Sequence, residues 1–325
     1  MGRAMDRLMK VLVAARLGEA ELKRRLAEQV GNQAIWVEDG DAMIPELPSA
    51  DVLICPDNFY SAKLAEAVRR EASKLAFIQL LTAGFDHAKR QGVPAHVTLC
   101  NAGEAYASSV ATHAIALLLA LQRRIPTVFA NQARHAWDRA FTPQLTMPAA
   151  GTVIVVGLGP IGREIARLLR AFGARVIGIT RRGRPDAVAN EVVSASALRD
   201  VLPHADAIVI AAPYDETTRH LIGAGELALC KKSAVLVNVA RGGIVEPRAL
   251  EAALRSGAIA GAGLDVTDPE PLPPNDPLWD APNLIITPHC AGASGAASGE
   301  RLTDLVSANL ARFMRGEKLQ HVVTL

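Results

Sequence analysis

The sequence lacks the features that indicate a membrane protein or a secreted protein. Its longest apolar helical run, residues 114–121, is far shorter than the roughly 20 residues that span a bilayer. The apolar run at 11–15 is too short for the core of a signal peptide. Asp6 stands where a myristoylation signal requires Ser or Thr. We therefore expect a cytoplasmic protein with no membrane partner.

Cysteine and net charge are also sparse. The four cysteines form no C-x-x-C pair and show no zinc-ligand spacing, which suits a reducing compartment and predicts no bound metal. They are Cys55, Cys100, Cys230 and Cys290. The net charge is only +2, so the composition gives no reason to expect nucleic acid as a partner.

What the sequence does contain is a repeated alternation of short apolar strands and helices. In the first third, strands are expected at 11–14, 34–37, 52–54 and 77–80, with helices at 19–29 and 62–72 between them. From residue 152 the alternation restarts, with strands expected at 152–156, 175–179, 207–211, 234–239, 260–266 and 284–287. Apolar strands that alternate with helices predict parallel sheets with both faces covered. A length of 325 residues suits two such α/β domains, and we expect a cleft between them.

The strand expected at 152–156 runs into a glycine motif. Gly157, Gly159 and Gly162 form G-x-G-x-x-G between this strand and a helical pattern. The first glycine permits the sharp turn, the second lets a diphosphate approach the backbone, and the third lets the helix pack close to the strand. Free amides at the helix start also favour a diphosphate. The motif predicts dinucleotide binding, and an ordinary tight turn of an α/β sheet is the alternative.

The next strand lacks the acidic residue that ends it in NAD-preferring folds. It runs into Thr180, Arg181 and Arg182, with Arg184 following. A carboxylate at this position holds the ribose hydroxyls of NAD and would repel a 2′-phosphate, whereas a guanidinium can pair with that phosphate. We therefore predict that NADP(H) is preferred over NAD(H). A solvated basic loop is the alternative interpretation.

Polar residues follow three of the later strands, and we expect Arg241, Glu270 and His289 to meet at the carboxyl edge of the sheet, where ligands bind. Reduction of a 2-oxo acid needs a cation for the carboxylate, which Arg241 can supply. It also needs an acid for the carbonyl oxygen, which His289 can supply. Glu270 would stabilise the imidazolium and orient its ring. The hydride would come from C4 of a nicotinamide.

The division into domains is expected near Gly103, ahead of a long helix at 106–123. The helix expected at 300–315 has no sheet of its own, so we expect it to return to the first domain. Residues 1–103 and 293–325 would then form one discontinuous domain, and residues 104–292 the dinucleotide-binding domain.

At these residues the chain resembles the D-isomer-specific 2-hydroxyacid dehydrogenases, from residues 81–87 to residues 287–289. The resemblance implies an enzyme with a Rossmann nucleotide-binding domain and a flavodoxin-like substrate-binding domain. It implies Arg241, Glu270 and His289 as catalytic residues, with Ala83, Gly84 and Arg241 binding the substrate carboxylate. The implied cofactor-binding residues are Gly157, Leu158, Gly159, Pro160, Ile161, Gly162, Thr180, Arg181, Arg182, Ala212, Pro213, Thr218, Val239, Ala240, Asp265, His289 and Gly292. Among these, Asp265 would contact the nicotinamide carboxamide.

The resemblance also carries expectations about substrate and assembly. Thr180 and the two arginines after it are most similar to NADPH-dependent glyoxylate/hydroxypyruvate reductases. Phosphoglycerate-specific members usually have a basic residue where residues 55–58 stand here, so we expect an unphosphorylated 2-oxo acid. The family is usually homodimeric, the helix at 106–123 resembles its dimer element, and residues 135–139 resemble a segment that reaches the neighbouring subunit.

Two alternatives stay open at this point. The substrate could be a larger 2-oxo acid, because the sequence does not report the size of the cleft. The chain could also be a catalytically weak, nicotinamide-sensing binding protein. Among the residues beside the expected site, we interpret His113 as packed within its helix and Cys290 as a small buried residue, since hydride transfer needs no thiol.

Overall fold

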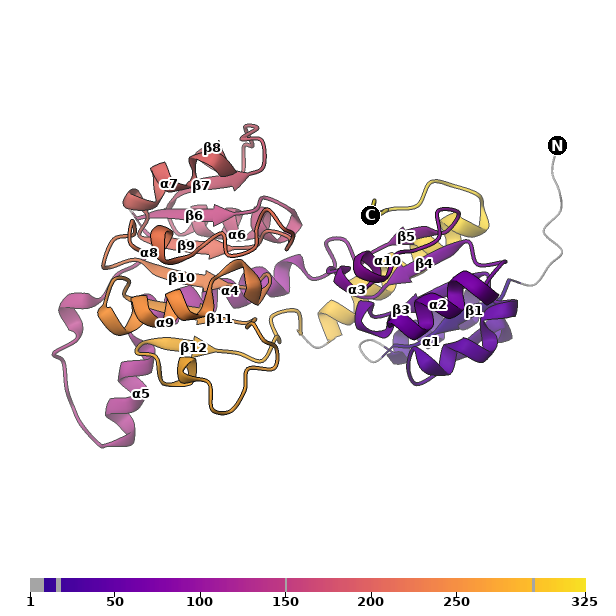
Figure 1. The fold of residues 1–325 in the computed structure, drawn as a ribbon, viewed down its shortest axis with the longest axis horizontal. Coiled ribbons are helices and arrows are strands. Elements are labelled where there is room, and N and C mark those ends of the chain that lie inside the picture. The colour runs from indigo at the N-terminus through magenta and orange to yellow at the C-terminus, as the bar shows by residue number, and fades with distance from the viewer. Residues whose placement is uncertain (1–8, 16–18, 150, 294–295) are drawn as a thin grey trace. The chain divides into compact units, whose positions relative to one another are not determined.

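The computed structural model describes residues 9–15, 19–149, 151–293 and 296–325, which form two compact units (Figure 1). One unit is Met1–Tyr106 together with Ser294–Leu325, and the other is Ala107–Ala293. Residues 1–8, which belong to the predicted first domain, lie outside the described residues. Within the described part of the chain, no helix is long and apolar enough to cross a membrane.

The first unit is built on a five-stranded parallel sheet of order β2-β1-β3-β4-β5. This is the doubly wound order of flavodoxin-like folds, as the sequence predicts. The strands are β1 (Val11–Val13), β2 (Ala34–Trp36), β3 (Val52–Cys55), β4 (Phe77–Leu80) and β5 (Thr98–Cys100). The helices are α1 (Glu19–Val30), α2 (Ala62–Glu71), α3 (Asp86–Gln91) and α10 (Ala296–Met314).

Both faces of this sheet are buried, which explains its unbroken apolar strands. Along β1, Leu12 enters one core cluster, and its neighbours Val11 and Val13 enter the other. Helix α10 belongs to this unit and covers the second face, where Phe313 packs against Phe77 with ring centroids 5.4 Å apart. The last helix of the chain therefore completes the core of the first sheet.

The second unit contains a seven-stranded parallel sheet of order β12-β11-β10-β9-β6-β7-β8. Its strands are β6 (Thr152–Val156), β7 (Arg175–Thr180), β8 (Glu191–Ser194), β9 (Ala207–Ile210), β10 (Val235–Asn238), β11 (Gly261–Leu264) and β12 (Leu284–Ile286). Its helices are α4 (Ala107–Gln122), α5 (Ile125–Ala133), α6 (Pro160–Ala171), α7 (Leu198–Val201), α8 (Ala224–Leu227) and α9 (Pro247–Ser256). The chain winds one way from β6 to β8 and the other way from β9 to β12. The carboxyl end of β6 is therefore the switch point, where such sheets bind ligands.

Two strands are not predicted by the sequence, and both are at the edge of a sheet. These are β5 and β8, the last strands of their sheets. An edge strand packs on fewer neighbours, and all four residues of β8 are partly or fully exposed. Its apolar pattern is weak for that reason. Two parallel-sheet α/β units are nonetheless confirmed.

Candidate active site

The glycine turn after β6 leaves room for a ligand at one of its three glycines. Gly157 has φ +92°, and a Cβ there would lie 2.6 Å from the Cα of Ala212. A Cβ on Gly162 would overlap the carbonyl oxygen of Gly157. At Gly159, by contrast, a Cβ would meet nothing within 4 Å. The outer glycines thus serve close packing, and the middle one faces open space at the start of α6, which fits a dinucleotide diphosphate.

The turn after β7 is basic and lines a cavity. Arg181, Arg182 and Arg184 lie around a volume of about 410 Å³, together with Leu158 of the glycine turn. The Thr180 hydroxyl accepts a hydrogen bond from the amide of Gly183 at 3.0 Å, which closes the turn. Thr180 ends the strand in place of a carboxylate, and this part of the site is therefore positively charged.

The cavity also contains one carboxylate, and a second reaches its arginines from another loop. Asp186 lines the cavity and is paired with Arg163 of α6. Arg181 contacts Asp215, which follows β9, at 3.2 Å. The arginines of this turn therefore differ in their partners.

Arg241, Glu270 and His289 follow β10, β11 and β12, which are neighbours in the sheet. The Nδ1 atom of His289 lies 2.6 Å from Oε1 of Glu270. Because an ionised carboxylate only accepts hydrogen bonds, Nδ1 is the donor in this pair. The side chains are 47% and 42% exposed, so Nε2 of the ring is left for a ligand. The structure brings this predicted pair together.

Arg241 lies in a turn that is itself packed against the loop of Glu270. The side chain of Asn238 accepts from the Ala240 amide at 3.0 Å and donates to the Arg241 carbonyl at 2.9 Å, which shapes the turn. A Cβ on Gly242 would overlap the backbone of Thr267. The glycine after the arginine therefore lets two loops of the site touch.

Asp265, at the end of β11, holds the backbone around His289. It is 1% exposed, and its carboxylate accepts from the Thr287 hydroxyl at 2.6 Å and from the amides of Cys290 and Ala291 at 3.0 Å each. Its carbonyl accepts from the His289 amide at 2.8 Å. His289 has φ +51°, a left-handed conformation that is uncommon for non-glycine residues, although histidine adopts it more often than most. These hydrogen bonds hold the backbone on both sides of His289; the contact of Asp265 with a nicotinamide stays a prediction.

His113 of α4 extends this network. Its Nε2 lies 2.9 Å from the Thr287 hydroxyl and 3.5 Å from the carboxylate of Asp265. His113, Asp265 and Cys290 have ligand atoms within 4.8 Å of one another, as a metal site requires. Because the oxygens of Asp265 already accept from three donors, we interpret the group as a hydrogen-bond network. That no metal binds stays a prediction.

The expectation that Cys290 is a buried packing residue is wrong. Cys290 is partly exposed, because it follows β12 at the edge of the sheet. Partial burial, together with the Asp265 carboxylate, raises the pKa of its thiol. The thiol is therefore protonated at neutral pH. This agrees with the expectation from the sequence that Cys290 is not a nucleophile.

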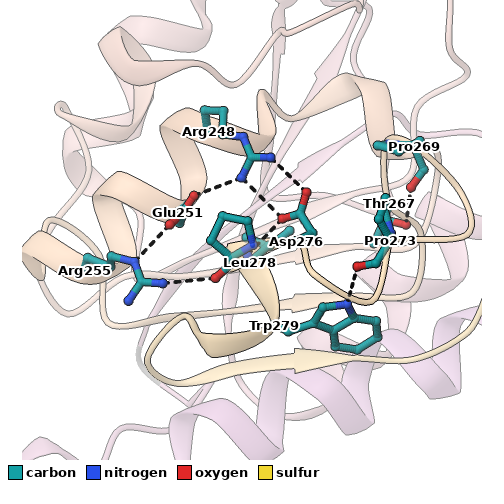
Figure 2. Close-up of polar contacts among 10 residues, drawn as sticks. Arg248, Glu251, Arg255, Thr267, Pro269, Pro273, Asp276, Leu278 and Trp279 are labelled. Atoms are coloured by element: carbon teal, nitrogen blue, oxygen red, sulfur yellow. Dashed lines mark hydrogen bonds and ion pairs between the residues drawn. The ribbon is translucent and has the colours of Figure 1, made fainter.

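The loop that carries Glu270 continues to residues 276 and 277, which are fastened to helix α9 (Figure 2). Arg248 of α9 donates to both carboxylate oxygens of Asp276, at 3.3 and 2.9 Å. Arg255, which lies about two turns farther along the same face of α9, donates to the carbonyl of Pro277 at 3.0 Å. Trp279 closes the loop on itself by donating from Nε1 to the carbonyl of Pro273 at 2.9 Å. The segment after Glu270 is therefore anchored by side chains.

In the first unit, the loop after β4 turns its carbonyls toward the protein. All four carbonyls of residues 81–84 accept hydrogen bonds. The donors are the Tyr106 hydroxyl to Leu81 (2.8 Å), the Ala102 amide to Thr82 (2.9 Å), Asn101 Nδ2 to Ala83 (2.7 Å) and the Thr82 hydroxyl to Gly84 (2.8 Å). In the described part of the chain, the amides of Ala83 and Gly84 have no acceptor. Two unpaired amides in a loop suit an anion such as a carboxylate.

Comparison with known proteins identifies the family. Residues 115–291 match the model of the D-isomer-specific 2-hydroxyacid dehydrogenase NAD-binding domain. The chain belongs to this family. A glyoxylate reductase of Korarchaeum cryptofilum is 33% identical over 250 residues, which cover 76% of this chain and 75% of that protein. The predicted family is thus confirmed.

Other relatives differ in length and in named substrate. A D-3-phosphoglycerate dehydrogenase of Methanocaldococcus jannaschii is 32% identical over 324 residues, which are 98% of this chain and 60% of that protein. This chain therefore spans about 60% of the length of that relative. The NADPH-dependent glyoxylate/hydroxypyruvate reductase of Sinorhizobium meliloti, solved with NADP and sulfate, has a TM-score of 0.82 at 27% identity, with 97% of this chain and 98% of that one covered.

The remaining predicted cofactor residues lie at the same sheet edge. Ala212 and Pro213 follow β9, Val239 and Ala240 follow β10, and Gly292 follows β12. The Thr218 hydroxyl donates to the carbonyl of Pro213 at 2.9 Å, so its hydrogen bonds close the turn after β9. Their contacts with a cofactor stay predictions.

Sequence reasoning missed several residues that shape the site. Thr287 stands two residues before His289, and the sequence pattern predicts no role for it. His113 was expected to pack in its helix, yet its ring contacts Thr287. Asp276 gives a local signal, since an acidic residue followed by proline is typical of a cap. The contact of Thr287 with His113, 174 residues away in the sequence, has no local signal.

We predict that Asp276 stabilises the loop of Glu270 by two separable contacts. Besides pairing with Arg248, it caps a short helix by accepting from the Leu278 amide at 2.9 Å. Asp276→Ala removes both contacts and should lower the free energy of unfolding by about 1–2 kcal/mol. Asp276→Asn keeps an acceptor for the cap and should cost less than about 1 kcal/mol, since Arg248 is exposed. Urea denaturation of both variants checks this, and equal losses would contradict it.

Proposed function

We propose that this chain transfers a hydride from NADPH to a small 2-oxo acid, giving a D-2-hydroxy acid, with glyoxylate and hydroxypyruvate as its first candidate substrates. The observation that carries the proposal is the 2.6 Å contact between His289 and Glu270. It lies at the carboxyl edge of the sheet whose switch point carries the glycine turn. A proton donor at that edge, in a member of this family, favours carbonyl reduction.

In the proposed reaction His289 donates a proton from Nε2 to the carbonyl oxygen of the substrate. Glu270 holds Nδ1, which orients the ring and stabilises the positive charge of the imidazolium. Arg241 binds the substrate carboxylate through its guanidinium. A bound NADPH supplies the hydride that the 2-oxo carbon accepts. One hydride on carbon and one proton on oxygen give the hydroxy acid, so the reaction balances.

The loop of the first unit supports the binding of a carboxylate. The amides of Ala83 and Gly84 are the groups that the family resemblance assigns to the substrate. Their carbonyls are already bound to other donors, so the loop presents N–H groups rather than oxygens. This agrees with an anionic substrate.

The substrate is proposed to be small and unphosphorylated. The residue two places after β3 is Asp57, which is 6% exposed and accepts from the amides of His87 and Ala88 at 2.8 and 2.9 Å. It therefore caps the first turn of α3 and supplies no cation. A phosphate group would need a cation at this place. Relatives named glyoxylate reductase support the same substrate class.

The preference for NADP(H) is proposed from the charge of the turn after β7. Arg181, Arg182 and Arg184 surround its cavity, and β7 ends in Thr180 rather than an acid. Guanidinium groups pair with phosphate through two hydrogen bonds. The reductase of Sinorhizobium meliloti, which was solved with NADP, supports the proposal.

The first test is absorbance of the reduced nicotinamide, with NADPH or NADH offered against glyoxylate, hydroxypyruvate, pyruvate and phenylpyruvate. We expect rapid oxidation of NADPH with glyoxylate or hydroxypyruvate. Faster turnover of phenylpyruvate would contradict the small substrate, and preference for NADH would contradict the cofactor. Binding of NADPH without turnover of any acid would favour a sensing protein.

His289→Ala should abolish turnover while leaving cofactor binding largely intact, because it removes the proton donor. We expect kcat to fall by about 10²–10⁴-fold, with the Kd for NADPH changed by less than about threefold. Stopped-flow kinetics and fluorescence titration measure the two quantities. The matched control is His204→Ala, which removes an exposed histidine that is distant from His289 in the sequence. Wild-type kcat in the His289 variant would show that the proton comes from elsewhere.

We also propose a homodimer formed through the segment after α4. Phe129 of α5 is 64% exposed, and Trp137 in the following loop is 96% exposed. Val128 and Met147 are exposed in the same part of the chain. Neighbouring exposed apolar side chains are typical of an interface.

Phe129→Asp should therefore weaken self-association, because it places a charge in an apolar interface. We expect the dimer Kd to rise by at least about tenfold. Light scattering at several protein concentrations gives the mass. Phe172→Asp, which alters another exposed phenylalanine of the same unit, serves as the control. A monomeric wild-type protein, or equal effects of the two variants, would contradict the proposed interface.

A further inference from the structure

An ion pair joins two loops on either side of the glycine turn. Arg181 follows β7 and Asp215 follows β9, while β6 lies between these strands in the sheet. Nη2 of Arg181 lies 3.2 Å from Oδ2 of Asp215. The arginine therefore reaches from the adenosine end of the proposed cofactor site to a carboxylate on the next loop.

The two oxygens of Asp215 have different partners. Oδ1 accepts from the Thr217 hydroxyl at 2.5 Å and from the amides of Thr217 and Thr218 at 2.8 and 3.2 Å. Oδ2 is the oxygen that faces Arg181. The Thr217 hydroxyl, the loop amides and Arg181 together lower the pKa of Asp215, so the carboxylate is ionised at neutral pH. A neutral amide could keep the contacts of Oδ1 while losing the charge.

The two partners also differ in how firmly they are held. The side chain of Asp215 is 21% exposed and fixed by its loop, whereas that of Arg181 is 76% exposed. An exposed ion pair of this kind is weak, and its long side chain can leave. Arg181 can therefore exchange Asp215 for another anion at small cost.

The neighbouring arginines are not committed in this way. Arg182 and Arg184 line the same cavity, and neither has an acidic partner in the described part of the chain. They are available to a phosphate in any case. The cavity thus holds two uncommitted guanidinium groups and one that a carboxylate already occupies.

We propose that Asp215 is a specificity-determining residue, which competes with the cofactor 2′-phosphate for Arg181 and so moderates the preference for NADP(H). The inference rests on the proposed function, since it assumes that this cavity receives the adenosine end of the cofactor. NAD(H) carries a hydroxyl in place of that phosphate and does not need Arg181. Asp215 therefore weakens the binding of one cofactor and leaves the other unchanged.

The test is the affinity of Asp215→Asn for NADP⁺ and NAD⁺, measured by calorimetry without substrate. The variant keeps the acceptor at Oδ1 and removes the charge at Oδ2. We expect the Kd for NADP⁺ to fall about two- to fivefold, as the loss of a weak exposed pair allows. The Kd for NAD⁺ should change by less than about twofold. An unchanged or raised Kd for NADP⁺ would overturn the inference.

Two further variants separate local competition from general electrostatics. Glu216→Gln removes the same charge one residue along the loop, from an exposed side chain, and should leave both affinities unchanged. Asp215→Asn made in an Arg181→Ala background should no longer tighten NADP⁺. Equal effects of the Asp215 and Glu216 variants, or a full gain without Arg181, would overturn competition for that arginine.

The single variants also separate this inference from the proposed function. If neither Arg181→Ala nor Arg182→Ala weakens NADP⁺, the proposed preference for NADP(H) is wrong, and the inference about Asp215 is wrong with it. If Arg181→Ala weakens NADP⁺ but Asp215→Asn has no effect, only the inference about Asp215 is wrong. Circular dichroism of each variant confirms that it is folded, so that no loss of affinity comes from unfolding.

Discussion

The parallel pairing of the strands is the constraint on which the rest of the second unit depends. Because all seven strands run the same way, their carboxyl ends meet at one edge. Arg241, Glu270 and His289 come from three separate loops, yet they follow neighbouring strands. The glycine turn lies on the strand where the winding reverses. The proposed nucleotide and substrate sites can share one edge only because of this arrangement.

Within that arrangement, buried polar groups give the loops their definite shape. A short loop after an edge strand has little apolar surface to hold it. Asp265 replaces that surface with hydrogen bonds to Thr287, Cys290 and Ala291. A buried carboxylate is costly to leave unpaired, so these donors and the acid depend on one another. The conformation of His289 is therefore set by a residue that need not take part in the chemistry.

The charged groups of the site differ in how firmly they are held. Asp265 is almost fully buried, and the Glu270 and His289 pair is half exposed. Arg181 is largely exposed and only loosely paired with Asp215. The firmly held groups shape the loops near the proposed site of reaction, whereas the loosely held one lies in the turn that we propose to discriminate between the cofactors. The most buried charged group therefore holds the loop of the proposed proton donor, and the most exposed one belongs to the proposed cofactor site.

Much of the fold and of the candidate site could be predicted from the sequence, because the relevant signals are local. A glycine or a polar residue after an apolar run marks the end of a strand. This signal predicts the turn at Gly157 and the pair of Glu270 and His289. Strands β5 and β8 were missed because they are short and give weak apolar patterns. The partial exposure of Cys290 was missed because exposure depends on tertiary packing and not on local sequence. The contacts of Thr287 with His113, and of Arg181 with Asp215, could be found only in the folded chain. Their partners are 174 and 34 residues apart in the sequence, and only the order of strands in the sheet brings them within hydrogen-bonding distance.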